Sequence, residues 1–269
     1  MTTLKNNTDK NSPIALFDSG VGGLTVLNKL KKLMPNEKYI YYGDTIHMPY
    51  GEKTKEQLLR YSSDIFGFFE EKGCKAVVMA CNTTSSVIYE DVYSKYKFKL
   101  FSIVHSVSEV LSSLDIARLG VFATKATILS GAYQKKIAQY NPNMKVFGQY
   151  CKDWVHFVEE NSMNLPKNKK IILSDLDRML ANNPEKIVLG CTHYPFLLEI
   201  LKEGAPEDIF IDPAEFFAEY IMAALGKEDL LSEEKQDSDE FYVSSNPEQF
   251  KISAKMFYSL DKAPDLLTF

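Results

Sequence analysis

The chain has 269 residues, of which 45% are hydrophobic and 25% are charged, an ordinary composition for a globular protein of one or two domains. Its net charge of -5 gives no general attraction to nucleic acid or to an anionic membrane. No apolar stretch approaches the length of a membrane span. Residues 1–12 are polar, lack the apolar core of a signal peptide and are expected to form a disordered tail. We therefore expect a cytoplasmic protein.

Short apolar runs alternate with segments of helical periodicity from residue 14 onward. The predicted strands are residues 14–17, 38–42, the run around Val77, 100–104, 119–122, 145–149, 187–190, 209–211 and 241–243. The predicted helices are residues 24–33, 54–72, a segment ending near 96, 127–139, a segment carrying Glu159, 171–180, 195–202 and 212–225, the last ended by Gly226. Such alternation predicts an α/β fold with mostly parallel sheets flanked by helices on both faces.

The second half of the chain repeats the first. The run Ile-Ala-Leu-Phe-Asp-Ser-Gly at 14–20 returns as Leu-Gly-Val-Phe-Ala-Thr-Lys at 119–125, and an apolar run ending in Cys81 returns as one ending in Cys191. The two offsets are 105 and 110 residues, which indicates one duplicated unit. Because open α/β sheets bind ligands at the carboxyl ends of their strands, the two thiols are expected on opposite sides of one cleft.

The cysteines are expected to be free thiols. No two of the four cysteines, Cys74, Cys81, Cys151 and Cys191, are separated by the two residues typical of zinc or redox motifs. The length of the chain argues against structural disulfides. Cys74 and Cys151 are expected to be buried packing residues. No metal site is predicted.

Three kinds of chemistry fit the remaining pair, Cys81 and Cys191. They could form a disulfide, Cys191 could act as a nucleophile with His193 as its base, or the two could serve as acid and base on opposite faces of one carbon. A helix is expected to begin after each of them, and a helix N-terminus can lower the pKa of a thiol towards neutrality.

A glycine-rich loop follows the first predicted strand. Asp18 and Ser19 precede Gly20, Gly22 and Gly23 and then a helix. Glycine lets backbone amides approach a ligand closely, and a helix N-terminus favours anions. The loop lacks the Gly-Lys-Ser/Thr of a phosphate-binding loop and the spacing of a dinucleotide-binding fingerprint. An aspartate beside an anion site favours a chemical role.

Six segments together resemble the glutamate racemases of the aspartate/glutamate racemase superfamily, over about residues 14–256. The matching segments are Phe-Asp-Ser-Gly-Val-Gly-Gly-Leu-Thr at 17–25, Tyr-Gly-Asp-Thr at 42–45, Pro-Tyr-Gly at 49–51, Ala-Cys-Asn-Thr at 80–83, Ser-Gly-Ala-Tyr-Gln at 130–134 and Gly-Cys-Thr-His-Tyr-Pro at 190–195. The resemblance implies a cofactor-independent isomerase that interconverts L- and D-glutamate and supplies D-glutamate for peptidoglycan. It also implies a homodimer with no nucleic-acid or membrane partner.

The resemblance also assigns roles to residues. Cys81 would take the Cα proton from D-glutamate with the assistance of Asp18, and Cys191 would take it from L-glutamate with the assistance of His193 and a nearby acid, Glu159. The residues implied to bind substrate are Asp18, Ser19, Tyr50, Gly51, Asn82, Thr83, Thr192 and His193. The active site would lie between two pseudosymmetric α/β domains, formed by residues 1–100 plus 212–269 and by residues 101–211.

The chain departs from the family pattern at Val104-His-Ser106, at Lys152-Asp-Trp154, at His156 and at Pro213. None of these departures touches a matched catalytic position. Three rival functions are a racemase of another substrate such as aspartate, a non-catalytic binding protein with the same fold, and a thiol hydrolase in which Cys81 is dispensable. Turnover on each amino acid, and the need for Cys81, would separate them.

Overall fold

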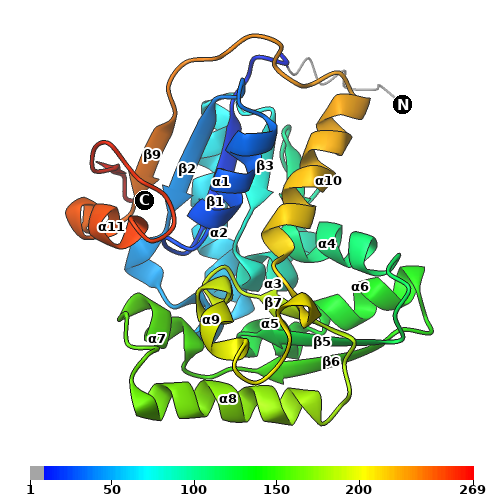
Figure 1. The fold of residues 1–269 in the computed structure, drawn as a ribbon. Helices are drawn as coiled ribbons and strands as arrows, with labels where there is room; N and C mark the ends of the chain where they lie inside the picture. Colours follow the sequence, from blue (N-terminus) through cyan, green and yellow to red (C-terminus); the bar gives the residue numbers. More distant parts are fainter. Residues whose placement is uncertain (1–8) are drawn as a thin grey trace.

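The structure, a computed structural model, describes residues 9–269 and contains two sheets, in each of which all paired strands are parallel (Figure 1). The first sheet has the order β10-β9-β2-β1-β3-β4 and the second has the order β6-β5-β7-β8. The strands of the first sheet are β1 (Ile14–Asp18), β2 (Tyr39–Gly43), β3 (Ala76–Met79), β4 (Lys99–Ser102), β9 (Glu240–Val243) and β10 (Asp265–Leu266). Those of the second are β5 (Arg118–Ala123), β6 (Lys145–Tyr150), β7 (Lys186–Gly190) and β8 (Phe210–Ile211).

The strand order reproduces the repeat seen in the sequence. The run β2-β1-β3-β4 in one sheet corresponds to β6-β5-β7-β8 in the other. The strands before Cys81 and Cys191, β3 and β7, therefore hold equivalent places. The two sheets occupy separate lobes, the upper and lower halves of the view in Figure 1.

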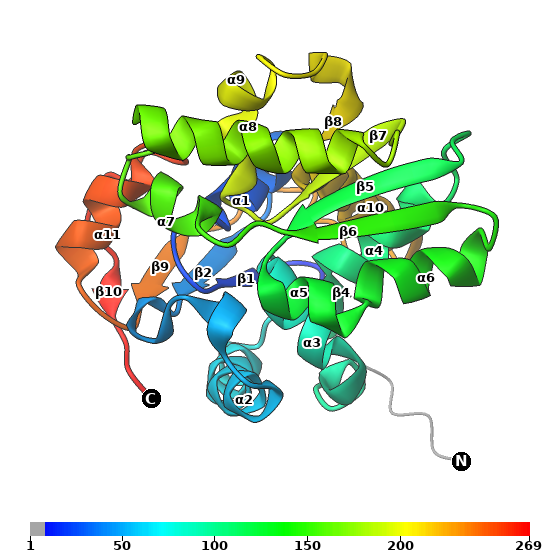
Figure 2. The ribbon, with the colours of Figure 1, turned by 90° about the horizontal axis from the view of Figure 1, so that it is seen from below.

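Helices cover both faces of the first sheet, as the alternation of strands and helices predicted. Along β1, Ile14 and Leu16 face one apolar cluster, while Ala15 and Phe17 face the other. The helices on the second cluster are α2 (Lys55–Glu71) and α3 (Asn82–Val92), which lie together in Figure 2. The first cluster holds α1 (Leu24–Leu33), α4 (Ile103–Leu111) and α10 (Pro213–Lys227) and continues into the second sheet. One apolar core thus joins the two lobes.

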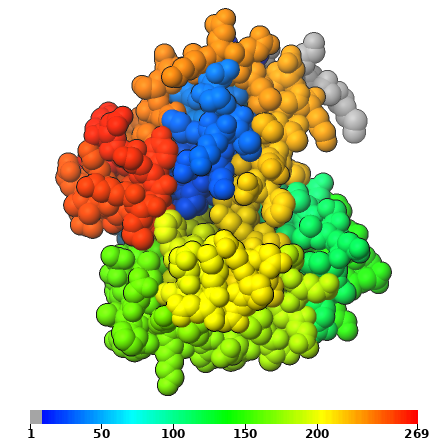
Figure 3. All heavy atoms as spheres, viewed as in Figure 1, coloured from blue at the N-terminus to red at the C-terminus, as the bar shows by residue number. Residues whose placement is uncertain are grey.

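The helices of the second lobe are short, with one exception. They are α5 (Lys125–Ser130), α6 (Ala132–Tyr140), α7 (Trp154–Glu159), the long α8 (Pro166–Leu180) and α9 (Leu198–Leu201). Near the C-terminus, α11 (Pro247–Ala254) returns to the first sheet, and the segment after it is drawn in red in Figure 3. Phe257 in this segment packs against Phe196 of the second lobe, with 4.2 Å between the ring centroids.

Several predicted elements were wrong in detail. The helix expected over 127–139 is two helices, because Gly131 adopts a left-handed conformation (φ 64°) between α5 and α6. His105 does not follow a strand but lies in α4, since the Ser102 hydroxyl accepts a hydrogen bond from the His105 amide and caps that helix. Gly226 does not end α10, which runs on to Lys227. Neither α11 nor β10 was predicted.

Within residues 9–269, no helix is both long enough and apolar enough to cross a membrane.

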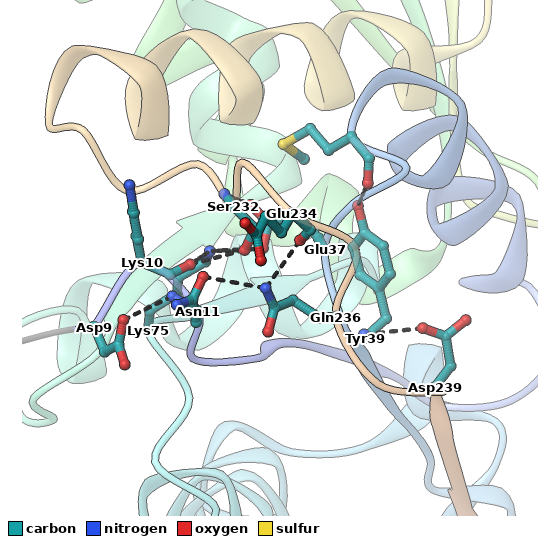
Figure 4. A network of polar contacts seen from close by, with 11 residues as sticks. Asp9, Lys10, Asn11, Glu37, Tyr39, Lys75, Ser232, Glu234, Gln236 and Asp239 are labelled. Atoms are coloured by element: carbon teal, nitrogen blue, oxygen red, sulfur yellow. Dashed lines mark hydrogen bonds and ion pairs between the residues drawn. The ribbon is translucent and has the colours of Figure 1, made fainter.

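A buried ion pair holds the segment that returns from α10 to β9 (Figure 4). The ammonium of Lys75 lies 2.6 Å from a Glu37 carboxylate oxygen, and these side chains are 0% and 1% exposed. The returning segment contributes Ser232, whose amide and hydroxyl both donate to Glu37 at 2.9 Å. Of the tail predicted over 1–12, residues 1–8 lie outside the described residues, whereas the Lys10 carbonyl accepts a hydrogen bond from the Lys75 ammonium.

The buried pair makes stability sensitive to the loss of either charge. Lys75→Met removes the ammonium and leaves the Glu37 carboxylate buried, which costs roughly 3–5 kcal/mol for broken buried pairs. We expect a loss of this size in the free energy of unfolding by urea. The exposed pair of Lys169 with Glu203 gives a matched control, and Lys169→Met should change stability little. A loss at Lys75 no larger than that at Lys169 would contradict the prediction.

Candidate active site

A cavity of about 250 Å³ lies between the lobes, at the carboxyl ends of strands from both sheets. This volume suits a small metabolite, since pockets for larger ligands occupy about 300–1,000 Å³. Its walls are formed by Ser19, Met48, Pro49, Tyr50, Gly51, Cys81, Asn82, Thr83, Thr124, Val155, His156, Glu159, Cys191, Thr192 and His193.

The two predicted thiols line this one cavity. Cys81 follows β3 and stands at the start of α3, and Cys191 follows β7. Their exposed fractions are 5% and 8%, and all four cysteines of the chain are free and buried. Because β3 and β7 belong to different sheets, each thiol approaches the cavity from its own lobe.

Asp18 lies behind the cavity wall at the end of β1. One of its carboxylate oxygens accepts hydrogen bonds from the amides of Gly20 (3.2 Å) and Gly23 (3.0 Å), while the other is buried without a partner in the protein. The anion held by the glycine-rich loop is therefore the Asp18 carboxylate itself. Burial raises the pKa of Asp18 to about 6, although the charge of His193 and the two amides oppose the shift.

The pKa of Cys81 is not lowered towards neutrality, so that prediction was wrong for this thiol. Burial raises the pKa of Cys81 to about 12, and the negative charge of Asp18 adds to the effect. The start of α3 favours a thiolate, but the loss of hydration at the buried Cys81 thiol outweighs it. For Cys81 to act as a thiolate, the bound ligand would have to supply a positive charge near it.

The thiol of Cys191 contacts an imidazole, which in turn contacts a carboxylate. His193 Nδ1 lies 3.8 Å from Cys191 Sγ, and His193 Nε2 contacts Glu159 of α7. Burial opposes a protonated imidazole, but the hydrogen bonds to Cys191 and Glu159 prevail and hold the pKa of His193 well above its ordinary value. His193 can thus hold a proton beside Cys191, with Glu159 as its counter-charge.

The other predicted binding residues all reach the cavity, but not all have free polar groups. The Tyr50 hydroxyl is turned towards Asp44, so only the ring of Tyr50 serves as wall. Asn82 receives a hydrogen bond on Oδ1 and keeps its Nδ2 without a partner in the protein. The Thr83 hydroxyl pairs with that of Thr124 at 2.9 Å. The others on the wall are Ser19, Gly51 and Thr192.

The two lobes meet closely at this point. A methyl group on Gly22 would come within 2.3 Å of the Thr192 hydroxyl and 2.9 Å of His193. Only glycine fits there, because such distances lie far inside normal contact. The glycine-rich loop therefore packs against the loop that carries Cys191.

Sequence reasoning missed part of the wall. Thr124 follows β5 as Ser19 follows β1, so the internal repeat already contained the signal for it. Met48 and Val155 had no such signal. His156, one of the departures from the family pattern, is exposed and lies at the cavity wall. Among residues 9–269, no group of three or more His, Cys, Asp or Glu side chains is disposed to hold a metal ion.

The arrangement suits proton transfer. Two thiols face one small cavity, His193 lies beside Cys191, and the negative charge of Asp18 acts on Cys81. The geometry of Cys191 with His193 would also serve a nucleophile, but that reading gives no role to Cys81. Acid–base chemistry at one carbon uses both.

The fold and the site define an α/β isomerase, and the comparisons with known proteins agree. A sequence model of the family described as Asp/Glu/Hydantoin racemase matches residues 23–221, and the chain belongs to this family. Within the family it groups with the glutamate racemases. The glutamate racemase of Thermoanaerobacter sp. (strain X514) is 36% identical over 91% of this chain and 92% of its own length.

Solved structures give the same result. Glutamate racemase from Francisella tularensis, in complex with D-glutamate, matches with a TM-score of 0.85 and 29% identity over 97% of this chain and 98% of its own. Glutamate racemase from Thermus thermophilus, in complex with β-chloro-D-alanine, matches with a TM-score of 0.84 and 33% identity over the same shares.

The raised pKa of Asp18 makes a prediction for Asp18→Asn. Since the folded protein binds this proton more tightly than the unfolded chain, wild-type stability falls relative to the variant as pH rises from about 4 to about 6. Above pH 7 we expect Asp18→Asn to be more stable by roughly 1–3 kcal/mol, because a shift of about two units at 1.36 kcal/mol each is partly offset by the new amide. The advantage should vanish near pH 4.

Denaturant unfolding of both proteins at pH 4 and pH 8 measures this difference, since every other carboxyl is shared. Asp18→Asn should at the same time lose most racemase activity. A variant that is no more stable than the wild type at pH 8 would show that burial of the ionised Asp18 carboxylate does not destabilise the folded protein.

Proposed function

We propose that this protein racemises glutamate without a cofactor, using Cys81 and Cys191 as the two bases. The observation that carries the proposal is the presence of both thiols on the walls of one cavity, each delivered by a different lobe. The Francisella tularensis relative binds D-glutamate and an Escherichia coli relative binds L-glutamate. We infer that the same pair of enantiomers occupies this cavity.

The proposed reaction moves one proton out and another in. With D-glutamate, the Cys81 thiolate removes the Cα proton and becomes a thiol, and the electron pair left on Cα is stabilised by the adjacent carboxylate. The Cys191 thiol then gives its proton to the opposite face and becomes a thiolate, which yields L-glutamate. The reverse direction exchanges the two roles. No bond other than Cα–H and S–H changes, so no oxidant or reductant is needed.

The neighbours of each thiol supply its proton balance. Asp18, with its pKa raised to about 6, would share a proton with Cys81, and His193 with Glu159 would do so for Cys191. The substrate's ammonium group would bring a positive charge into the cavity. Such a charge favours the thiolate of Cys81 and offsets its burial. Closure over the substrate would exclude water and strengthen these interactions.

The remaining wall would hold the substrate's charged groups. The unpaired Nδ2 of Asn82 and the hydroxyls of Ser19, Thr83 and Thr192 would bind carboxylate oxygens. Gly51 would present its backbone beside them, while Tyr50 would contribute only its ring. Asp18 would attract the ammonium group from behind the wall.

Wider parts of the proposal follow from the family. We propose that the product D-glutamate serves peptidoglycan synthesis, and that residues 1–100 plus 212–269 and residues 101–211 act as two domains that close on the substrate. The homodimer and the cytoplasmic location stay predictions. Aspartate racemisation is the nearest rival, and turnover of L-aspartate in place of L-glutamate would favour it.

The test of the proposed function is turnover of L-glutamate by the purified protein, followed by optical rotation with no added cofactor or metal. Single substitutions Cys81→Ser and Cys191→Ser should each reduce kcat at least about 100-fold, the lower end of the range for a general acid or base. Cys151→Ser, a buried cysteine outside the cavity wall, is the control and should keep activity. Racemisation that survives Cys81→Ser but not Cys191→Ser would show that one thiol is enough, and would contradict the two-base proposal.

Glu159→Gln tests the proton partner of Cys191. Because the equilibrium constant of a racemisation is one, kcat/KM must fall equally in both directions, by about 10- to 100-fold for a group that acts through His193. The slower proton transfer at Cys191 should raise the primary isotope effect on kcat/KM with α-deuterated L-glutamate and lower it with α-deuterated D-glutamate. Equal changes in the two isotope effects would exclude a role specific to Cys191.

A further inference from the structure

Tyr133 lies in the sequence segment 130–134, which matched the family but had no assigned role. It belongs to α6, two residues after the left-handed Gly131. Its hydroxyl donates a hydrogen bond of 2.9 Å to Oδ1 of Asn82, and the two residues are 2% and 3% exposed. Asn82 is the first residue of α3, next to Cys81, so this bond runs from the second lobe to the first.

The bond holds the side-chain amide of Asn82 in place at the cavity wall. With Oδ1 taken by Tyr133, the Nδ2 group is left buried and without a partner in the protein, although Asn82 lies on the cavity wall. A buried N–H without an acceptor is costly. A carboxylate oxygen of the substrate is an acceptor that would satisfy it.

The position of Tyr133 is itself fixed. A methyl group on Gly190, the residue before Cys191, would lie 3.4 Å from the Tyr133 ring, so the ring packs directly on the end of β7. Next to Asn82, Thr83 pairs with Thr124 of the second lobe. The first two residues of α3 are therefore both bonded to the opposite lobe.

We propose that Tyr133 is a positioning residue that holds the Asn82 amide in the place where its free N–H group meets a carboxylate oxygen of the substrate. This inference rests on the proposed function. Without the tyrosine hydroxyl, the buried Oδ1 of Asn82 loses its donor and the amide is no longer held in this place. The second lobe thus supports a substrate contact made by the first lobe, through a residue that does not line the cavity.

The test is the steady-state kinetics of Tyr133→Phe with D- and L-glutamate. A contact made equally in ground state and transition state changes KM and leaves kcat. We expect KM to rise roughly 3- to 10-fold, the worth of one hydrogen bond, with kcat changed less than about 2-fold. Tyr39→Phe is the matched control, because its buried hydroxyl donates to the Met34 carbonyl away from the cavity and its loss should leave KM unchanged.

Combination with Asn82→Ala shows whether Tyr133 acts through Asn82. In the Asn82→Ala protein, Tyr133→Phe should have no further effect on KM, because the amide that it holds is absent. Effects that multiply would overturn the proposal, as would an unchanged KM in the single variant. A wild type with no turnover of glutamate would instead overturn the proposed function.

A second substitution does not depend on the folding of Tyr133→Phe. Asn82→Asp keeps an acceptor for the Tyr133 hydroxyl but has no N–H to offer the ligand. We expect it to raise KM at least as much as Asn82→Ala does. A KM equal to that of the wild type would show that the substrate does not need this N–H group, and would overturn the proposal.

Discussion

The carboxyl ends of two parallel sheets face one cavity, and the rest of the site depends on this arrangement. Because every paired strand is parallel to its neighbours, the residues that follow β1 and β3 emerge at one edge of the first sheet, and those that follow β5 and β7 emerge at one edge of the second. The same strand order in both lobes puts a hydroxyl and a thiol at equivalent places. A carbon held between the lobes would then have one thiol on each face.

The burial that brings the thiols together also makes their charged forms costly. The pKa of Cys81 rises to about 12 and that of Asp18 to about 6, so the charged forms of both groups are disfavoured by burial. The second lobe uses a different arrangement, in which His193 bridges Cys191 and Glu159. The two thiols therefore have different surroundings in a pseudosymmetric frame. A zwitterionic ligand would supply the missing positive charge on one side.

The features that could be predicted from the sequence are those encoded over a few residues. The apolar runs before Cys81 and Cys191 and the repeat between the half-chains led to the parallel sheets and to one shared cavity. Long-range packing had no such local signal: the burial that raises the pKa of Cys81, the turn of the Tyr50 hydroxyl towards Asp44 and the return of α11 to the first sheet follow from contacts between distant segments. Thr124 lies between these cases, because the repeat marked it as the counterpart of Ser19.

The most direct measurement of the two-thiol mechanism is the fate of the Cα hydrogen during the first part of the reaction. L-Glutamate would be incubated with the protein in D2O and the reaction stopped well before equilibrium, after which the separated enantiomers would be analysed by mass spectrometry. Proton transfer by two thiols predicts D-glutamate with one deuterium at Cα and recovered L-glutamate that still carries hydrogen. Deuterium appearing equally in both enantiomers, or product without deuterium, would contradict it, because either result requires a single base that serves both faces.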